Sequence, residues 1–372
     1  MNKEPITKNK EPQTYPLNWL YFYLTEGCNL KCRHCWIAPK FQDASRSYPV
    51  LSVDLFKSIV KQAKPLGLSG VKLTGGEPLM NPEIGKIIEH VKDQELNLFV
   101  ETNGVLCTPE IARQMGTCKN HFVSVSLDGA DASTHEWVRG IAGCFNSALE
   151  GVKNLVNAGI KPQIIMSIMR HNKDQMEALV RLAESIGAES VKFNITMPVA
   201  RGKKLHDSRD TLTIEELVNL GSWVENTLSD STDLRLVYDH PAAFRPLGRM
   251  FGETGDGCSR CGILGILGVL ANGNYALCGI GENVPELVFG HAAHDRLEDI
   301  WKTTKVLNEL REGLTHRFEG ICGDCLMKNI CLGSCMAQNF YTNKHLWAPF
   351  WYCEEAEKAG LFPETRMRPK DM

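Results

Sequence analysis

Three cysteines fall within a short stretch near the start of the chain: Cys28, Cys32 and Cys35, spaced C-x3-C-x2-C. Thiolates at this spacing can bind three irons of a four-iron, four-sulfur cluster, whereas a fully ligated cluster takes four cysteines. The fourth iron is then open and can bind a substrate. Gly27 and Asn29 permit the tight loop that brings three sulfurs to one centre. The motif therefore predicts a reactive cluster.

Zinc sites and disulfide bonds are the alternative uses of clustered cysteines. A structural zinc site takes four ligands, usually as separated pairs, and three cysteines in one short loop fit that pattern poorly. The chain carries 14 cysteines. Residues 1–17 are polar and rich in Lys and Glu, unlike a signal or transit peptide. We therefore expect a cytoplasmic protein, and in that compartment disulfides are rare.

A glycine-rich turn follows the alternating segment 70–74. It consists of Gly75, Gly76, Glu77 and Pro78. Two glycines let backbone amides and carbonyls approach a ligand closely, although Gly-Gly before Pro is also an ordinary turn. Its position after both a strand and the three-cysteine loop favours the binding role.

Both motifs lie at the ends of strands in a regular alternation of strands and helices. Strands are predicted at 18–25, 70–74, 96–100, 122–126, 161–169 and 190–196. Helices are predicted after the N-cap Ser52 and at 82–94, 109–116, 144–158, 173–186 and 214–228. This alternation predicts parallel βαβ units in an α/β fold. Such folds place active sites at the carboxyl ends of their strands, where both motifs fall.

The cysteine loop and the glycine-rich turn together resemble the signature of the radical S-adenosylmethionine (radical SAM) superfamily. The residue before the last cysteine is often aromatic in that family and is His34 here. The resemblance implies a partial (β/α)6 barrel and SAM chelated to the open iron. It also implies that SAM is cleaved to methionine and a 5′-deoxyadenosyl radical, which takes a hydrogen atom from an unactivated C–H bond.

The same resemblance implies which residues bind cluster and cofactor. Cys28, Cys32 and Cys35 hold the catalytic cluster, and the backbone of Gly75, Gly76, Glu77 and Pro78 faces the SAM amino group. The other implied SAM contacts are Asn103, Ser126, Asp128, Arg139 and Asn194. A guanidinium binds a carboxylate in a bidentate way, which suits Arg139 to the SAM carboxylate. The alternatives are a surface salt bridge for Arg139 and a turn role for Asp128.

A second set of cysteines occupies the C-terminal third. Its spacings resemble the SPASM domain, which binds auxiliary iron–sulfur clusters beside a radical SAM barrel. The interleaving in that family implies an inner cluster on Cys258, Cys261, Cys278 and Cys335. It implies an outer cluster on Cys322, Cys325, Cys331 and Cys353. Cys107, Cys118 and Cys144 are left over, and we expect them to be small core residues.

Two points about this second set stay open. A zinc knuckle on Cys322, Cys325, Cys331 and Cys335 is the alternative, but it leaves Cys278 and Cys353 unused. Cys258 lies close to Cys261 in sequence. If Cys258 is not a ligand, the inner cluster has a free iron that can bind a substrate thiolate. If all eight cysteines are ligands, the auxiliary clusters serve as electron acceptors.

The resemblance narrows the substrate to a few classes. SPASM enzymes mostly act on peptides or proteins, and the run from Tyr21 to Trp36 looks most like short maturases of ribosomally made peptides. Oxidative modification or crosslinking of a peptide, including thioether formation at cysteine, is the expected reaction. Tetrapyrrole or other small-molecule chemistry is the alternative. Sulfatase maturation is disfavoured because those enzymes carry an Asp where this chain has Gly279.

The composition limits partners and domains. The 372 residues are 43% apolar with a net charge of −3, which gives no electrostatic support for nucleic-acid binding. The longest apolar run is too short to span a bilayer. We expect a tail at 1–17, a barrel at 18–212, a connecting helix and linker at 213–250, and the auxiliary-cluster domain at 251–372. Expected partners are a peptide, a reductase such as flavodoxin or ferredoxin, and a separate leader-binding protein, because only 27 residues precede Cys28.

Overall fold

A single curved sheet forms the centre of the protein. The structure, a computed structural model, describes residues 15–252 and 261–369. Across these residues the strand order is β12-β11-β10-β1-β4-β5-β6-β7-β8-β9. The strands are β1 (Trp19–Tyr23), β4 (Gly70–Thr74), β5 (Asn97–Thr102), β6 (His121–Ser126), β7 (Gln163–Ile168), β8 (Ser190–Ile195), β9 (Arg235–Tyr238), β10 (Ile266–Val269), β11 (Asn274–Ala276) and β12 (Val288–His291). A separate short pair joins β2 (Gly27–Cys28) to β3 (Lys40–Phe41).

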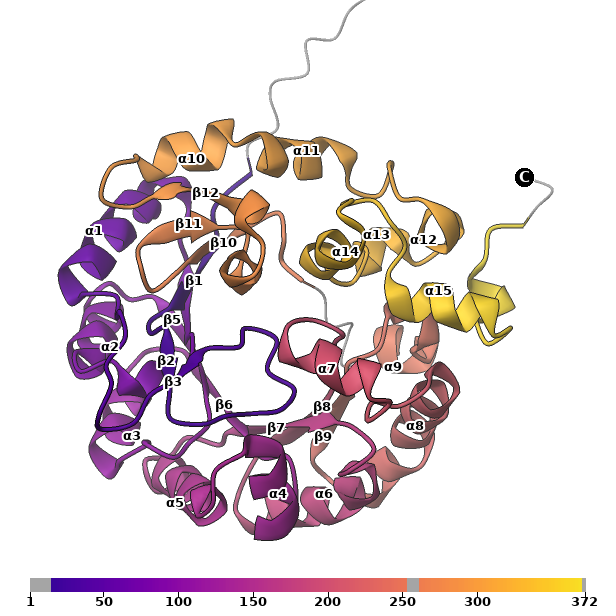
Figure 1. The fold of residues 1–372 in the computed structure, drawn as a ribbon, viewed down its shortest axis with the longest axis horizontal. Coiled ribbons are helices and arrows are strands. Elements are labelled where there is room, and N and C mark those ends of the chain that lie inside the picture. Colours follow the sequence, from indigo (N-terminus) through magenta and orange to yellow (C-terminus); the bar gives the residue numbers. More distant parts are fainter. Residues whose placement is uncertain (1–14, 253–260, 370–372) are drawn as a thin grey trace, which may run out of the picture.

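Helices surround this sheet on the outside (Figure 1). Those of the barrel are α1 (Val53–Ala63), α2 (Ile84–Asp93), α3 (Pro109–Gly116), α4 (Ala132–Arg139), α5 (Cys144–Asn157), α6 (Met176–Ser185), α7 (Arg201–Asp207), α8 (Ile214–Asn226) and α9 (Leu247–Phe251). The C-terminal ones are α10 (Leu297–Thr303), α11 (Lys305–Gly313), α12 (Gly320–Asp324), α13 (Lys328–Cys331), α14 (Met336–Asn343) and α15 (Trp351–Lys358). In Figure 1, α12 to α15 complete the ring beside α8 and α9.

Short 3₁₀ helices connect many of these elements. They are η1 (Lys64–Leu66), η2 (Pro78–Met80), η3 (Lys173–Gln175), η4 (Leu228–Ser231), η5 (Ala242–Phe244), η6 (Gly279–Glu282), η7 (Pro285–Leu287) and η8 (Glu364–Arg366). Two of them, η2 and η6, directly follow segments predicted to bind cofactor or cluster.

The predicted parallel α/β architecture is confirmed. The six predicted strands are β1, β4, β5, β6, β7 and β8, and each pairs in parallel with its neighbour. The carboxyl ends of parallel strands meet at one edge of the sheet. That edge therefore collects the ends of all six predicted strands.

The sheet extends beyond the six predicted strands at both sides. β9 pairs in parallel with β8, although the sequence predicted only a helix and linker at 213–250. On the other side, β10 pairs in parallel with β1 and continues into the antiparallel strands β11 and β12. The predicted domain boundaries remain predictions, but the sheet itself runs from the barrel into the C-terminal region.

Local sequence explains where the first helix begins and which face it buries. The Ser52 hydroxyl accepts a hydrogen bond from the Leu55 N–H at 3.3 Å, which confirms the predicted N-cap. Apolar residues recur at helical spacing, so one face packs on the sheet. Phe56 on that face is fully buried, and its ring centroid lies 4.4 Å from that of Phe22 on β1.

The three cysteines left over by the sequence analysis are core residues, as predicted. Cys107, Cys118 and Cys144 are each 3% exposed. Cys107 and Cys118 belong to the main core, whereas Cys144 packs against Cys28 and Cys32 of the cysteine loop. Within the described part of the chain, no helix has the length and apolar character needed to cross a membrane.

Removing the Phe56 ring tests the packing of α1 on the sheet. We expect Phe56→Ala to lower the free energy of unfolding by about 3–5 kcal/mol, because the ring is fully buried against Phe22 and leaves a cavity. Urea unfolding followed by circular dichroism measures the change. Phe251→Ala, at a side chain 64% exposed, is the matched control and should change little. Equal effects of the two substitutions would contradict the packing described.

Candidate active site

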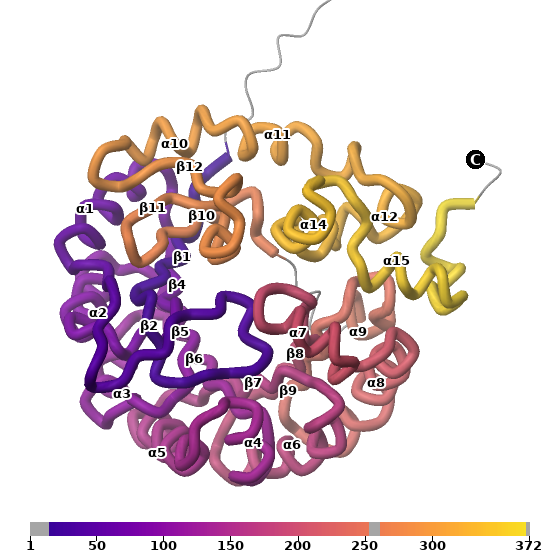
Figure 2. The backbone as a smooth tube through the Cα atoms, in the orientation of Figure 1, coloured from indigo at the N-terminus to yellow at the C-terminus, as the bar shows by residue number. Residues whose placement is uncertain are grey.

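The three thiols of the cysteine loop line a single pocket of about 170 Å³ at the carboxyl edge of the sheet. The β2–β3 pair closes the base of the loop. The Lys31 and Arg33 N–H groups donate to the Arg139 and Val138 carbonyls at the end of α4, at 3.0 and 2.9 Å. Figure 2 shows the indigo segment that carries the loop lying across the centre of the ring of strands. The loop is therefore fixed to both the sheet and α4.

The glycine-rich turn packs against the backbone that leads into the cysteine loop. A Cβ on Gly75, whose φ is +132°, would lie 2.9 Å from the Leu24 nitrogen, and a Cβ on Gly76 would lie 1.9 Å from the Gly27 carbonyl oxygen. Gly76 lines the pocket, while Gly75 and Pro78 do not. The two glycines are thus required first for close packing of backbone on backbone, a reason that the sequence analysis did not identify.

Glu77 holds the turn against the end of β5. Its buried carboxylate accepts hydrogen bonds from the Thr102 hydroxyl at 2.6 Å, the Asn103 N–H at 2.8 Å and the Leu79 N–H at 3.1 Å. Burial raises the pKa of Glu77, and these three donors only partly offset that effect. Asn103 lines the pocket and donates to Asn29 of the cysteine loop at 2.8 Å. Glu77 therefore positions Asn103.

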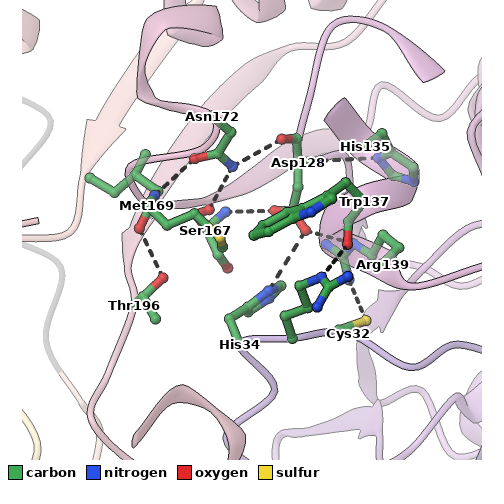
Figure 3. A network of polar contacts seen from close by, with 12 residues as sticks. Cys32, His34, Asp128, His135, Trp137, Arg139, Ser167, Met169, Asn172 and Thr196 are labelled. Atoms are coloured by element: carbon green, nitrogen blue, oxygen red, sulfur yellow. Dashed lines mark hydrogen bonds and ion pairs between the residues drawn. The ribbon is translucent and has the colours of Figure 1, made fainter. Parts of the chain in front are cut away.

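A buried ion pair lies directly behind the thiols (Figure 3). Arg139 Nε is 2.7 Å from Asp128 Oδ2, with these side chains 8% and 0% exposed. Arg139 Nη1 donates to Cys32 Sγ at 3.5 Å. Burial alone would raise the pKa of Asp128, but the Arg139 charge, followed by two histidines, holds that pKa below its usual value. Both partners are therefore charged at neutral pH.

The structure places Asp128 differently from the predicted role. Asp128 does not line the pocket, whereas Arg139 does. Its Oδ1 accepts the Ser167 N–H at 2.8 Å, and its backbone carbonyl accepts from Asn172 Nδ2 at 2.9 Å. Asp128 therefore orients Arg139 and joins β6 to β7 rather than facing the pocket. Ser126 and Asn194 line the pocket, and their contact with SAM stays a prediction.

Several pocket residues were not predicted to bind SAM. Ser167, Glu101 and Arg201 line the pocket, as does His34, whose Nδ1 lies 4.0 Å from Asp128 Oδ2. Burial lowers the pKa of His34 to about 4, with Asp128 opposing that shift. Glu101 on β5 and Ser167 on β7 stand at strand positions whose side chains point to the pocket face of the sheet. The period of two along a strand was the sequence signal that could have identified them. Arg201 binds the Cys32 carbonyl at 3.3 Å, and nothing in its sequence context predicts that contact.

The C-terminal thiols gather around two neighbouring cavities, and their assignment to two clusters stays a prediction. Cys322, Cys325, Cys331 and Cys353 line one small cavity. Cys261 and Cys335 line a second chamber of about 340 Å³, which Cys331 also borders. Burial raises the pKa of Cys278, and Cys335 and then Cys261 raise it further, so these three thiols lie near one another. Cys258 lies outside the described residues.

The arrangement of the thiols also bears on the type of metal centre. In the parts of the chain that the structure describes, no three His, Cys, Asp or Glu side chains form a group that could hold a metal ion. The thiols line cavities instead, and several cysteine thiolates around one centre are the ligand set of an iron–sulfur cluster. Three thiols at the cysteine loop and four at the small cavity fit the donor set of iron–sulfur clusters, and Cys261, Cys278 and Cys335 supply three thiols near the chamber.

Gly279 has no room for a side chain. A Cβ there would lie 2.2 Å from Tyr23 Cε1 and 2.5 Å from the Tyr23 hydroxyl oxygen. Tyr23 is 3% exposed and packs with Leu270 and Ala276. The Tyr23 ring thus occupies the position where an acidic residue after Cys278 would extend.

Comparison with known proteins agrees with this geometry. Residues 22–183 match the family model of the radical SAM superfamily, and residues 255–326 match that of SPASM, an iron–sulfur cluster-binding domain. The mycofactocin maturase MftC of Mycolicibacterium smegmatis is 29% identical over 94% of this chain and 86% of that protein. The AdoMet-dependent heme synthase of Methanosarcina barkeri is 28% identical over 85% of this chain and 90% of that protein.

A solved structure supports the fold. Streptococcus suis SuiB, in a crystal structure bound to its precursor peptide SuiA, superposes with a TM-score of 0.72 at 18% sequence identity. The match covers 92% of this chain and 76% of that one. The barrel and the C-terminal region of this chain therefore have together the same overall fold as this solved structure.

Neutralising Asp128 tests its role behind the thiols. We expect Asp128→Asn to lower the free energy of unfolding by about 3–5 kcal/mol, because the Arg139 charge stays buried without its counter-charge. Urea unfolding measures this loss. Asp131→Asn is the control, since Asp131 is an exposed N-cap of α4 and Asn caps as well as Asp. A similar loss in both variants would show that the buried pair has no special role.

A methyl group at Gly279 tests the contact with Tyr23. We expect Gly279→Ala to cost about 1–3 kcal/mol, because the buried ring has to move to accommodate it. Gly262→Ala is the matched control, since its Cβ would meet only Ile266 Cγ2 at an ordinary 3.4 Å. The melting temperatures of the two variants give the comparison. An unchanged melting temperature for Gly279→Ala would mean that Tyr23 does not fill this space.

Proposed function

We propose that this chain, which belongs to the radical SAM superfamily and carries a SPASM domain, is a maturase that oxidatively modifies a ribosomally synthesised peptide. The position of the chamber supports this most directly. His34, Ser167 and Asn194 line both the three-thiol pocket and the chamber, and Cys261 and Cys335 also line the chamber. A substrate in the chamber lies between the radical-forming cluster and an electron acceptor.

The residues around the pocket have distinct tasks in this reaction. When bound, SAM and a four-iron cluster on Cys28, Cys32 and Cys35 supply a 5′-deoxyadenosyl radical that takes a hydrogen atom from the substrate. Arg139, held by Asp128, is oriented to pair with the SAM carboxylate in a bidentate way. Asn103 and Ser126 offer further polar contacts on the same pocket wall.

The substrate radical has to lose one electron and one proton to become a closed-shell product. The inner thiol group borders the chamber, which suits it to hold the cluster that accepts the electron. We assign Cys258, Cys261, Cys278 and Cys335 to this inner cluster, and Cys322, Cys325, Cys331 and Cys353 to an outer cluster that passes the electron onward. A flavodoxin or ferredoxin would reduce the first cluster, and a separate leader-binding protein would present the peptide, all in the cytoplasm.

Tetrapyrrole chemistry is the second candidate, because an AdoMet-dependent heme synthase covers most of this chain. The chamber argues against it. Its volume of about 340 Å³ is at the low end of the 300–1,000 Å³ usual for ligand pockets, and Lys192, Asp239 and Gln338 are among its walls. A small, polar chamber suits a peptide segment better than a large apolar macrocycle. Sulfatase-type chemistry is disfavoured by the Tyr23 ring at Gly279.

Iron counting and SAM cleavage test the proposal. After anaerobic reconstitution, we expect about twelve irons per wild-type chain and about eight in Cys32→Ala, since three four-iron clusters fall to two. With dithionite, only the wild type should form 5′-deoxyadenosine, which chromatography detects.

A cysteine outside the three groups provides the control. Cys118→Ala should keep the full iron content and the cleavage activity, because Cys118 is a buried core residue. Bound zinc in place of iron, with no SAM cleavage by the wild type, would overturn the proposed function.

A further inference from the structure

Gln338 is a buried side chain whose hydrogen-bonding groups are unused. It lies on α14, three residues after Cys335, and is 2% exposed. Neither its amide oxygen nor its amide nitrogen has a hydrogen-bond partner among the described residues. Buried polar groups are nearly always paired. Gln338 lines the chamber, so a molecule in the chamber is the available partner.

Other unpaired groups line the same chamber. Asn194, at the end of β8, has a buried Oδ1 without a partner, and so do the Trp351 indole N–H and the Tyr352 hydroxyl on α15. These groups come from both the barrel and the C-terminal region. The chamber therefore presents donors and acceptors from both regions of the chain.

The charged side chains on the chamber walls, Lys192 and Asp239, in contrast form an ion pair with each other. Lys192 Nζ lies 3.3 Å from Asp239 Oδ2, and His240 Nε2 lies 3.4 Å from the buried Glu225 carboxylate. His34 Nδ1 lies 4.0 Å from Asp128 Oδ2, and its lowered pKa leaves the His34 ring neutral. The unpaired groups are thus neutral, and they match a neutral ligand with both a donor and an acceptor better than a free carboxylate or ammonium group.

A peptide main chain has this chemistry. In an extended chain, the N–H and C=O of one residue point to the same side, which is how paired strands exchange two hydrogen bonds. A carboxamide offers the matching acceptor and donor. We propose that Gln338 binds the main-chain N–H and C=O of one extended substrate residue, with Asn194 accepting a second N–H from the chamber wall. This inference rests on the proposed peptide substrate and adds how that substrate is recognised.

The test uses a short probe because the natural peptide is unidentified. N-acetyl-dialanine amide, with deuterium on its carbon atoms, is dialysed to equilibrium against anaerobic holoenzyme with SAM. We expect Gln338→Leu, which keeps the side-chain size, to weaken its binding about 25-fold, because two hydrogen bonds are lost and the net loss of each is worth about fivefold. After reduction, deuterium transferred into 5′-deoxyadenosine should fall by a similar factor.

Two comparisons make the result specific. A probe with an ester in place of its central amide should bind the wild type about fivefold more weakly than the amide probe does, because it lacks one of the two hydrogen-bonding groups. Asn339→Leu is the control, because Asn339 is equally buried on the same helix but does not line the chamber. It should bind the amide probe like the wild type.

Each opposing outcome overturns the proposal in a recognisable way. Loss of about four irons in Gln338→Leu would mean that Gln338 serves the inner cluster. Equal probe binding by Gln338→Leu and the wild type, or no probe binding by the wild type, would remove the peptide-reading role even if 5′-deoxyadenosine is formed. The absence of 5′-deoxyadenosine from both proteins would instead be a failure of the proposed function.

Discussion

The buried ion pair between Asp128 and Arg139 is the interaction on which the site depends. Arg139 ends α4, and the backbone carbonyls of that helix end hold the cysteine loop. Asp128 follows β6 and binds the backbone of β7. Two charges without water are costly unless they meet each other and further donors, so their positions are closely specified. The pair thereby sets the loop, the helix and two strands in one arrangement and fixes a positive charge at the thiols.

The sequence allowed the strand alternation and the cysteine grouping to be predicted because both depend on local pattern. Alternating apolar residues define β4 and β5, and the spacing of Cys322, Cys325 and Cys331 is visible without coordinates. The place of Asp128 behind Arg139 was not predictable. A motif identifies the residues that come together, but not which of them lines the pocket and which lies behind it. β9 was not predicted because its four residues are too few to show a clear alternation of apolar and polar side chains.

The adjacency of the pocket and the chamber explains how one protein can both start and finish a radical reaction. Four residues, His34, Trp36, Ser167 and Asn194, line both cavities, so a reactive species generated on one side reaches a substrate without crossing solvent. The paired charges around the chamber keep it polar yet neutral overall. Such a lining can hold a peptide backbone of varied side-chain composition while discriminating against charged small molecules.

The pairing of β1 with both β4 and β10 has a consequence for the order of biosynthesis. β1 is made first but gains its second neighbour only after nearly the whole barrel has emerged from the ribosome. Until then one side of β1 presents unpaired N–H and C=O groups, which invite pairing with other chains, and such distant contacts form slowly. The C-terminal cysteines lie in the same region as β10. Delivery of iron and sulfide to them would therefore help that region to fold, cover the open side of β1 and protect the nascent barrel from aggregation.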